Sequence, residues 1–254
     1  MIRVAVSGAG GRMGGLVAET VADQADFDFV AGYDPHAPGV DVAGVTVSDD
    51  PAVVGAADVV VEFTTPDVVM DNLARWHDLG THAVVGTSGF DDARIAALRT
   101  RWSEGPPRCL IVPNFSIGAV LMMRFAEMAA PHFAASEIIE LHHDHKADAP
   151  SGTALSTAAR MNAAQGRQER EVRSEELLPG ARGADAASVP VHSVRLPGLL
   201  AHQEVLFGSA GETLVIRHDT SDRVSFMPGV LLAVREVGDL PEPVTVGLEG
   251  LLGI

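Results

Sequence analysis

Residues 4–14 read Val-Ala-Val-Ser-Gly-Ala-Gly-Gly-Arg-Met-Gly, an apolar strand that runs directly into a glycine-rich turn. A helical pattern begins at Arg12, so the turn joins a strand to a helix. Glycines there permit close approach to a pyrophosphate, and the helix N-terminus adds free N–H groups and a favourable dipole. Met13 replaces the third glycine of the strict G-x-G-x-x-G pattern, which leaves a looser G-x-x-G-x-x-G variant. The turn is either purely structural or a dinucleotide site that uses Gly8, Ala9, Gly10, Gly11, Arg12 and Met13.

The sequence around this turn alternates apolar strands with helical patterns. The strands are rich in Val and Ile and nearly continuous in apolar character, as in a parallel sheet covered on both faces. This alternation predicts βαβ units and a Rossmann-like, doubly wound α/β sheet, with Pro66 in a first helical turn and Gly80 just after a helix. The expected strands are Ile2–Val6, Phe27–Gly32, Val59–Phe63, His82–Val85 and Cys109–Val112, and the helices are Arg12–Asp23, Asp67–Leu79 and Asp91–Trp102.

The pattern changes after Pro113. Three strand-like runs follow one another without a helix between them, which indicates a smaller α+β domain with a mixed or antiparallel sheet. Residues 165–188 are polar and contain glycine, so we expect a long loop there. The expected elements of the second half are helices 117–131, 151–165 and 226–237, and strands 137–142, 191–196, 202–207, 213–218 and 244–247.

Composition excludes several classes of protein. The 254 residues are 46% hydrophobic and 20% charged, and no apolar run reaches the roughly 18 residues of a membrane span. The net charge of −16 disfavours nucleic acid and anionic lipid as partners, and an anionic substrate would need locally gathered positive charge. The single cysteine, Cys109, excludes an internal disulfide and is expected to be a small buried strand residue. A cytoplasmic protein is the default.

An acidic residue follows the second expected strand. Asp34 stands where a carboxylate accepts hydrogen bonds from the adenosine ribose hydroxyls, although Asp34-Pro35 is also compatible with a polar turn. A carboxylate there repels a 2′-phosphate, and Pro35 supplies no compensating charge, whereas Arg12 offers one nearby. The pattern therefore favours NADH and leaves NADPH open.

Two further turns follow strands that should end at the same edge of the sheet. Ligands of open α/β sheets bind at the carboxyl ends of the strands, so both turns are candidates for the nicotinamide end of the site. Each is equally compatible with a simple connection. The candidate residues are Gly86, Thr87 and Ser88 in the first turn, and Val112, Pro113, Asn114 and Phe115 in the second.

The segment from Glu140 to Ala154 holds three of the ten histidines and the only lysine of the sequence. A metal site is one interpretation, since imidazole binds zinc. However, adjacent strand residues point to opposite faces, so His142 and His143 do not easily share an ion, and Lys146 would repel a cation. We therefore expect no metal.

Acid catalysis with anion binding explains the segment better. Histidine titrates near neutral pH and can deliver a proton, and Lys146 supplies positive charge for a carboxylate or a second proton. The following helix start, with hydroxyls, backbone N–H groups and little steric obstruction, is suited to an anion. The expected carboxylate cradle consists of Ser151, Gly152 and Thr153.

The pattern of residues 140–154 is long, and a match to it is therefore specific. Residues 140–154 closely resemble the signature of the 4-hydroxy-tetrahydrodipicolinate reductase (dihydrodipicolinate reductase) family, and the resemblance extends over essentially the whole chain, including residues 8–14, 86–88, 112–115, 178–183 and 201–205. It implies reduction of 4-hydroxy-tetrahydrodipicolinate by NADH or NADPH with loss of water, in the diaminopimelate route to lysine. Ser88 replaces a threonine usual in the family.

By the same resemblance, His142 matches the proton donor and Lys146 a second proton donor. His143, Gly152 and Thr153 match substrate contacts, and Asp34 matches the ribose-binding acid. The resemblance further implies a cytoplasmic homotetramer and a chain that returns to its first domain. The expected domains are 1–113 with 219–254, for the dinucleotide, and 114–218, for substrate and oligomerisation; we expect them to close when both ligands bind.

Three other functions are compatible with parts of the sequence. A different nicotinamide dehydrogenase, such as an amino-acid dehydrogenase, would share the first half but would not need the segment from Pro150 to Ala154. A metal-dependent hydrolase would lose its activity to a chelator. A redox sensor would bind the dinucleotide without turnover.

Overall fold

The computed structural model describes residues 1–165 and 174–254, and the chain divides into two units. The first unit consists of Met1–Ile117 and Phe226–Ile254, and the second consists of Gly118–Ser225. The chain therefore leaves the first unit and returns to it, with boundaries a few residues beyond those expected from the sequence.

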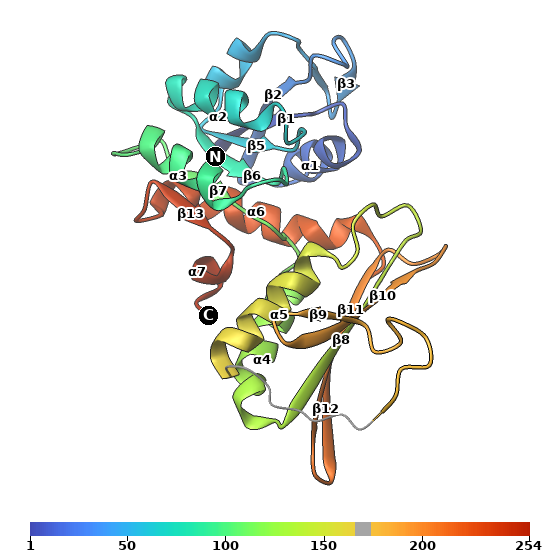
Figure 1. Ribbon diagram of the computed structural model, residues 1–254. Helices are drawn as coiled ribbons and strands as arrows, with labels where there is room; N and C mark the ends of the chain where they lie inside the picture. Colours follow the sequence, from blue (N-terminus) through green and yellow to red (C-terminus); the bar gives the residue numbers. More distant parts are fainter. Residues whose placement is uncertain (166–173) are drawn as a thin grey trace. The chain divides into compact units, whose positions relative to one another are not determined.

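The first unit is built on a six-stranded sheet in the order β13-β7-β6-β5-β1-β2, and every strand pair in it is parallel (Figure 1). The chain adds β2 on one side of β1 and β5 on the other, so the order reverses at the β1–β5 pair. Such a switch point opens a crevice at the carboxyl ends of the strands. The strands are β1 Ile2–Ser7, β2 Phe27–Tyr33, β5 Val59–Glu62, β6 His82–Val85, β7 Cys109–Ile111 and β13 Val244–Val246.

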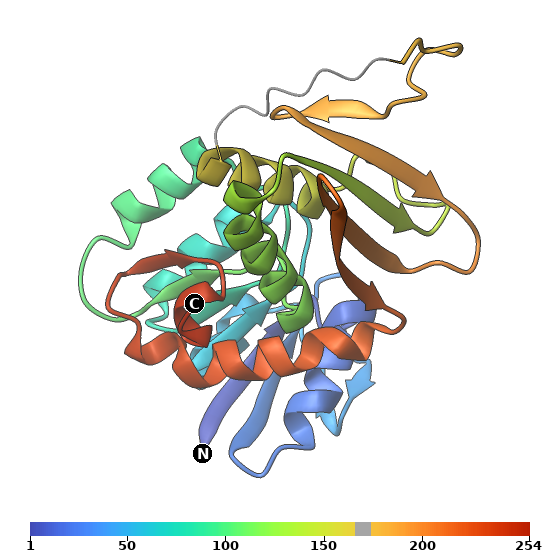
Figure 2. The same cartoon turned by 90° about the horizontal axis from the view of Figure 1, so that it is seen from below.

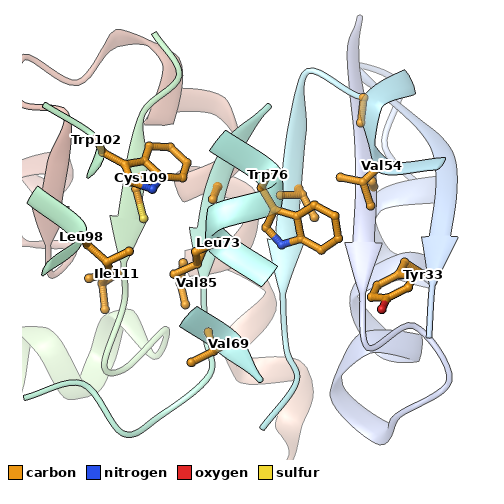
Figure 3. Packing of buried hydrophobic residues seen from close by; sticks show 14 of the residues in the cluster. Tyr33, Val54, Val69, Leu73, Trp76, Val85, Leu98, Trp102, Cys109 and Ile111 are labelled. Atoms are coloured by element: carbon orange, nitrogen blue, oxygen red, sulfur yellow. The ribbon is translucent and has the colours of Figure 1, made fainter. Parts of the chain in front are cut away.

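Burial explains why these strands are almost continuously apolar. All four residues of β5 and all three of β7 are buried, because helices cover the sheet. Figure 3 shows Trp76 and Trp102 packed with aliphatic side chains of this core. Cys109 lies among them as the expected buried strand residue, and burial raises the pKa of its thiol, so it remains unreactive.

The helices of this unit are α1 Arg12–Ala22, α2 Val69–Asp78, α3 Asp92–Arg101, α6 Met227–Glu236 and α7 Glu249–Leu252. α2 begins at Val69 rather than at the predicted Asp67: Pro66 lies in a turn, and the N–H groups of Val68 and Val69 both donate to Thr65 O. Gly80 follows α2 with φ +74°, which glycine adopts without steric cost. The short elements of this unit were not predicted, because each is too short to show a period: the β3 Asp41–Val42 and β4 Val45–Thr46 hairpin, the 3₁₀ helices Pro51–Ala56 and Val237–Asp239, and α7.

The second unit contains a five-stranded sheet in the order β12-β11-β8-β10-β9. β8 lies at its centre, parallel to β10 and antiparallel to β11, so the sheet is mixed. Although β10 and β11 follow one another in the chain, β8 separates them in the sheet. β9 falls inside the predicted loop, whose residues 166–173 lie outside the described part of the chain. The strands are β8 Ala135–His142, β9 Ala184–Ala186, β10 Val189–Arg195, β11 Ala201–Ser209 and β12 Glu212–Thr220.

Two helices, α4 Ile117–Ala129 and α5 Gly152–Gln165, run along one face of this sheet (Figures 1 and 2). Ala126 of α4 and Ala158 of α5 pack with Ile138 and Phe207 of the sheet. α4 ends earlier than predicted, and a 3₁₀ turn continues it to His132, since Pro131 has no N–H to extend the α-helical ladder. None of the helices in residues 1–165 and 174–254 has both the length and the apolar character of a membrane span.

Candidate active site

In the first unit, the candidate residues gather where parallel strands end. β1 is followed by the glycine-rich turn, β2 by Asp34, β6 by Gly86 and β7 by Val112. Because parallel strands end at one edge of a sheet, the structure brings these predicted residues together.

Close packing explains the glycines of the turn. Gly8 has φ +81°, and a Cβ there would overlap Phe63 O. A Cβ on Gly14 would overlap Gly8 O, because α1 packs directly onto the turn. Gly11 begins α1 without a side-chain hydrogen bond to the helix start. A pyrophosphate fits such a start, since uncapped N–H groups are suited to an anion.

Asp34 is held in place by the turn itself. Its carboxylate accepts the Gly10 N–H at 3.1 Å and the His36 N–H at 3.0 Å. Asp34 is 9% exposed, and these two hydrogen bonds fix the orientation of its carboxylate. This geometry suits an acceptor for ribose hydroxyls.

The two later turns divide into buried and accessible residues. Thr87 is buried; its hydroxyl donates to Glu62 O and accepts the Thr64 N–H at 2.9 Å. Phe115 packs on Phe63 at 5.5 Å between ring centroids, and Gly86 leaves room for both rings. The buried residues form the carboxyl edge of the sheet, and Ser88 and Pro113 are exposed there. Asn114 Oδ1 accepts the Ser116 N–H within the second turn.

Sequence reasoning missed Glu62, a fully buried acid at the end of β5. Its carboxylate accepts hydrogen bonds from the Thr64 hydroxyl, Asn72 Nδ2 at 3.2 Å and Trp76 Nε1 at 2.8 Å. These donors compensate the burial of the carboxylate and anchor the loop after β5 to α2. An acid at the end of an otherwise apolar strand was the available signal.

In the second unit, the predicted proton donor lies at the carboxyl end of β8. His142 Nδ1 is 2.5 Å from Glu140 Oε2. The two residues share a face because they are two apart on a strand. The His142 side chain is 14% exposed and the Glu140 side chain 0%, so the imidazole separates the carboxylate from solvent.

Arg195, at the end of β10, completes this cluster from a neighbouring strand. Its two terminal nitrogens donate to the two Glu140 oxygens, each at 2.8 Å, and one also donates to Asp148 O at 2.7 Å. Arg195 and His142 are register partners in the parallel β8–β10 pair. Sequence reasoning missed Arg195, since it lies 55 residues from Glu140.

Burial is the main influence on the pKa of His142 and lowers it. Glu140 opposes this effect through its hydrogen bond and its charge, whereas Lys146 and Arg195 add to the lowering. The pKa of His142 lies below its usual value, so the unliganded side chain is mostly neutral at pH 7.

The loop after β8 holds Lys146 in an ion pair but leaves His145 exposed to solvent. Lys146 Nζ donates to Asp148 Oδ1 at 2.6 Å, and the side-chain exposures are 21% and 57%. Lys146 lowers the pKa of Asp148 through this bond. The His145 side chain is 88% exposed. Among the described residues, no group of three or more His, Cys, Asp or Glu side chains is placed to hold a metal ion.

The predicted carboxylate cradle lies at the start of α5. Ser151 is buried; its hydroxyl accepts the Ala154 N–H and its own N–H donates to Glu140 Oε1 at 3.2 Å. A Cβ on Gly152 would meet nothing within 4 Å, so this glycine leaves open space at the helix start. Thr153 occupies the first turn of the helix. Ser151 therefore links the start of α5 to Glu140, and Gly152 leaves the helix start unobstructed.

The chain matches the two halves of one protein family. Residues 2–115 match the description "Dihydrodipicolinate reductase, N-terminus", and residues 118–252 match "Dihydrodipicolinate reductase, C-terminus". The C-terminal match includes the segment after Phe226 that returns to the first unit.

Curated relatives are similar over their full length. Proteins described as 4-hydroxy-tetrahydrodipicolinate reductase are 54% identical in Cutibacterium acnes, 54% in Thermobifida fusca and 50% in Mycolicibacterium gilvum. Each alignment covers 100% of this chain and 100% of the relative.

Solved structures of other proteins are similar to this chain in fold. A dihydrodipicolinate reductase from a Paenisporosarcina species, with dipicolinate bound, has a TM-score of 0.84 and 37% identity over 98% of this chain and 99% of that chain. The apo scyllo-inositol dehydrogenase from Lactobacillus casei has a TM-score of 0.61 at 12% identity, over 100% of this chain and 93% of that one. The latter likeness extends to the fold alone.

Proposed function

The chain belongs to the dihydrodipicolinate reductase family and catalyses its reaction, the reduction of 4-hydroxy-tetrahydrodipicolinate, and we propose which residues carry it out. A single observation supports the assignment most strongly. Glu140 accepts from His142 with one oxygen and from the Ser151 N–H with the other, so one buried carboxylate ties the proton donor to the start of α5. A ring dicarboxylate held at that helix start therefore lies next to an acid and the Lys146 ammonium.

The nicotinamide dinucleotide is assigned to the edge of the parallel sheet. Its pyrophosphate fits the turn from Gly8 to Met13, and its adenosine ribose fits Asp34. The nicotinamide end is assigned to residues 86–88 and 112–115. We favour NADH over NADPH, because the fixed Asp34 carboxylate repels a 2′-phosphate and the next residue is Pro35.

The residues of the second unit bind the dicarboxylate and deliver a proton. Lys146, His143 and the Gly152–Thr153 backbone are assigned to the substrate carboxylates. A bound reduced nicotinamide supplies the hydride. Negative charge then develops on the conjugated imine of the ring, and the His142 imidazolium gives its Nε2 proton while Lys146 offsets the remaining charge. Loss of the hydroxyl group as water precedes the hydride transfer and creates a carbon–carbon double bond conjugated with the imine; hydride and proton then saturate this bond, and the imine is retained.

One assay tests this function against its alternatives. The purified chain is mixed with freshly generated 4-hydroxy-tetrahydrodipicolinate, NADH and EDTA, and NADH absorbance is followed. Steady oxidation is the expected result. Dinucleotide binding without turnover would indicate a sensor, and turnover only without EDTA would indicate a metal enzyme. Repeating the assay with NADPH tests the cofactor preference.

We also propose a cytoplasmic homotetramer joined through the second sheet. The sheet face opposite α4 and α5 carries Ile139 and Leu206 beside half-exposed Val215, which is an apolar strip suited to another copy. Light scattering at assay concentration should give four times the mass of the chain; the mass of one chain would reject the assembly.

A further inference from the structure

A buried ion pair lies directly behind the candidate proton donor. We propose that Glu140, held by Arg195, is a positioning residue that keeps the Nδ1 proton on His142, so that Nε2 is the atom that loads and delivers the catalytic proton. The inference rests on the proposed function and adds two residues to it. Neither residue has to touch the substrate.

The hydrogen bonds around Glu140 hold its carboxylate in one orientation. Its two oxygens accept from both terminal nitrogens of Arg195, from His142 Nδ1 and from the Ser151 N–H. Burial acts to raise the pKa of Glu140, but hydrogen bonds from Arg195, Ser193 and His142 outweigh it and lower the pKa. The carboxylate is therefore ionised at neutral pH and accepts hydrogen bonds without donating any.

An acceptor at 2.5 Å determines the tautomer of His142. Since the Glu140 carboxylate has no proton to donate, the hydrogen in the bond must belong to Nδ1. Neutral His142 then carries a lone pair on Nε2, and only the imidazolium has a proton there to give. Nε2 takes that proton from solvent before the reaction, passes it to the substrate, and His142 returns to its neutral Nδ1–H form.

The surrounding charges act on this loading step in opposite directions. Glu140 on β8 favours the imidazolium, whereas Lys146 in the following loop and Arg195 on β10 disfavour it. Replacing Glu140 with a neutral residue removes the attraction and leaves the Arg195 cation uncompensated. Replacing Arg195 with a neutral residue removes the repulsion between its guanidinium and the His142 imidazolium. The two substitutions should therefore shift the titration of His142 in opposite directions.

A merely structural role predicts something different. Arg195 and Glu140 also join β8 to β10, and an ion pair of that kind would affect stability without moving the titration of His142. The control is Glu127→Gln, which makes the same change in a carboxylate of the second unit that pairs with Arg124 and Arg160 and has no histidine partner in the described part of the chain.

The test measures ring ¹⁵N shifts of His142 against pH in the full-length chain, with signals assigned by their loss in His142→Gln. The same preparations give kcat/KM against pH. We expect an Nδ1–H form at high pH in the unsubstituted chain. Glu140→Gln should move the Nε2 titration and the basic limb of kcat/KM to lower pH, Arg195→Gln should move both to higher pH, and Glu127→Gln should move neither.

Two results would overturn the proposal. One is a neutral His142 that carries its proton on Nε2. The other is a His142 titration that, in both Glu140→Gln and Arg195→Gln, coincides with that in Glu127→Gln. If Glu140→Gln does not fold, Arg195→Gln alone tests the proposal: a His142 titration that moves to higher pH supports it, and one that does not move or moves to lower pH overturns it. If the ¹⁵N titrations move as expected but no preparation reduces the substrate, the proposed function fails and the positioning role stands.

Discussion

At the scale of single residues, the candidate chemistry depends on a histidine that is almost covered but retains one accessible ring nitrogen. The His142 side chain is 14% exposed and its Nδ1 is bound to Glu140. Within residues 1–165 and 174–254, no side chain or backbone group hydrogen-bonds to its Nε2. That atom is therefore available to a ligand at the end of β8.

His142→Gln should lower kcat by about 10²–10⁴-fold, the usual contribution of a positioned general acid. The dinucleotide Kd should not change, because the glycine-rich turn belongs to the other unit. Steady-state kinetics and fluorescence titration with NADH measure the two effects. A variant that retains the unsubstituted turnover would show that His142 is not the acid.

Lys146→Ala should raise KM for the dicarboxylate and lower kcat, because a charge-assisted hydrogen bond contributes about 1.5–3 kcal/mol, or roughly 10–100-fold. The control is His145→Ala in the same loop, whose side chain is 88% exposed. Equal kinetics for the two variants would remove Lys146 from the site.

At the scale of elements, two helix starts carry glycine for different reasons. Gly14, in α1, sits against Gly8 O, whereas Gly152, which begins α5, faces open space. The first glycine is required by packing, and the second is compatible with a ligand that occupies the space.

Gly14→Ala should destabilise the first unit by about 1–3 kcal/mol through overpacking and should weaken dinucleotide binding. Gly152→Ala should leave the melting temperature nearly unchanged but raise the Kd for dipicolinate, the ligand of the solved relative. Thermal unfolding and calorimetric titration test the pair. Full dipicolinate affinity in Gly152→Ala would contradict the proposed cradle.

Local signals explain which elements were predictable. The strands of the first sheet were found to within a residue, because burial on both faces makes them continuously apolar. The start of α2 and the short hairpin were not found, because Pro66 also suits a turn and two-residue strands show no alternation. The order of the second sheet was equally inaccessible, since a strand does not encode its neighbour in its own sequence.

At the scale of the whole molecule, several titratable groups link stability to pH. Burial is the largest cause that lowers the pKa of His82, His142 and His218 below 6.5. Between the unfolded and folded values the unfolded chain binds more protons, so stability falls as pH decreases through that window. Carboxylates with lowered pKa values, such as Glu140 and Asp148, add a further loss at lower pH.

The free energy of unfolding should therefore be greater at about pH 8 than at about pH 5.5, the range that brackets the ordinary histidine value. Urea unfolding at the two pH values measures it. His82→Gln should reduce the difference for the first unit, and His145→Gln, at an exposed position, should not. Equal stability at the two pH values would show that the buried histidines are not linked to folding.

The amino-acid sequence by itself determined the parallel sheet, the glycine-rich turn, the acid after the second strand and the position of the histidine–lysine segment. Each depends on periodicity, backbone conformation or residue type within a short stretch. Only the tertiary structure decided that Arg195 meets Glu140 from 55 residues away and that Glu140 in turn holds His142. The physical reason is that strand order and register, rather than proximity in the chain, determine which buried charges become partners.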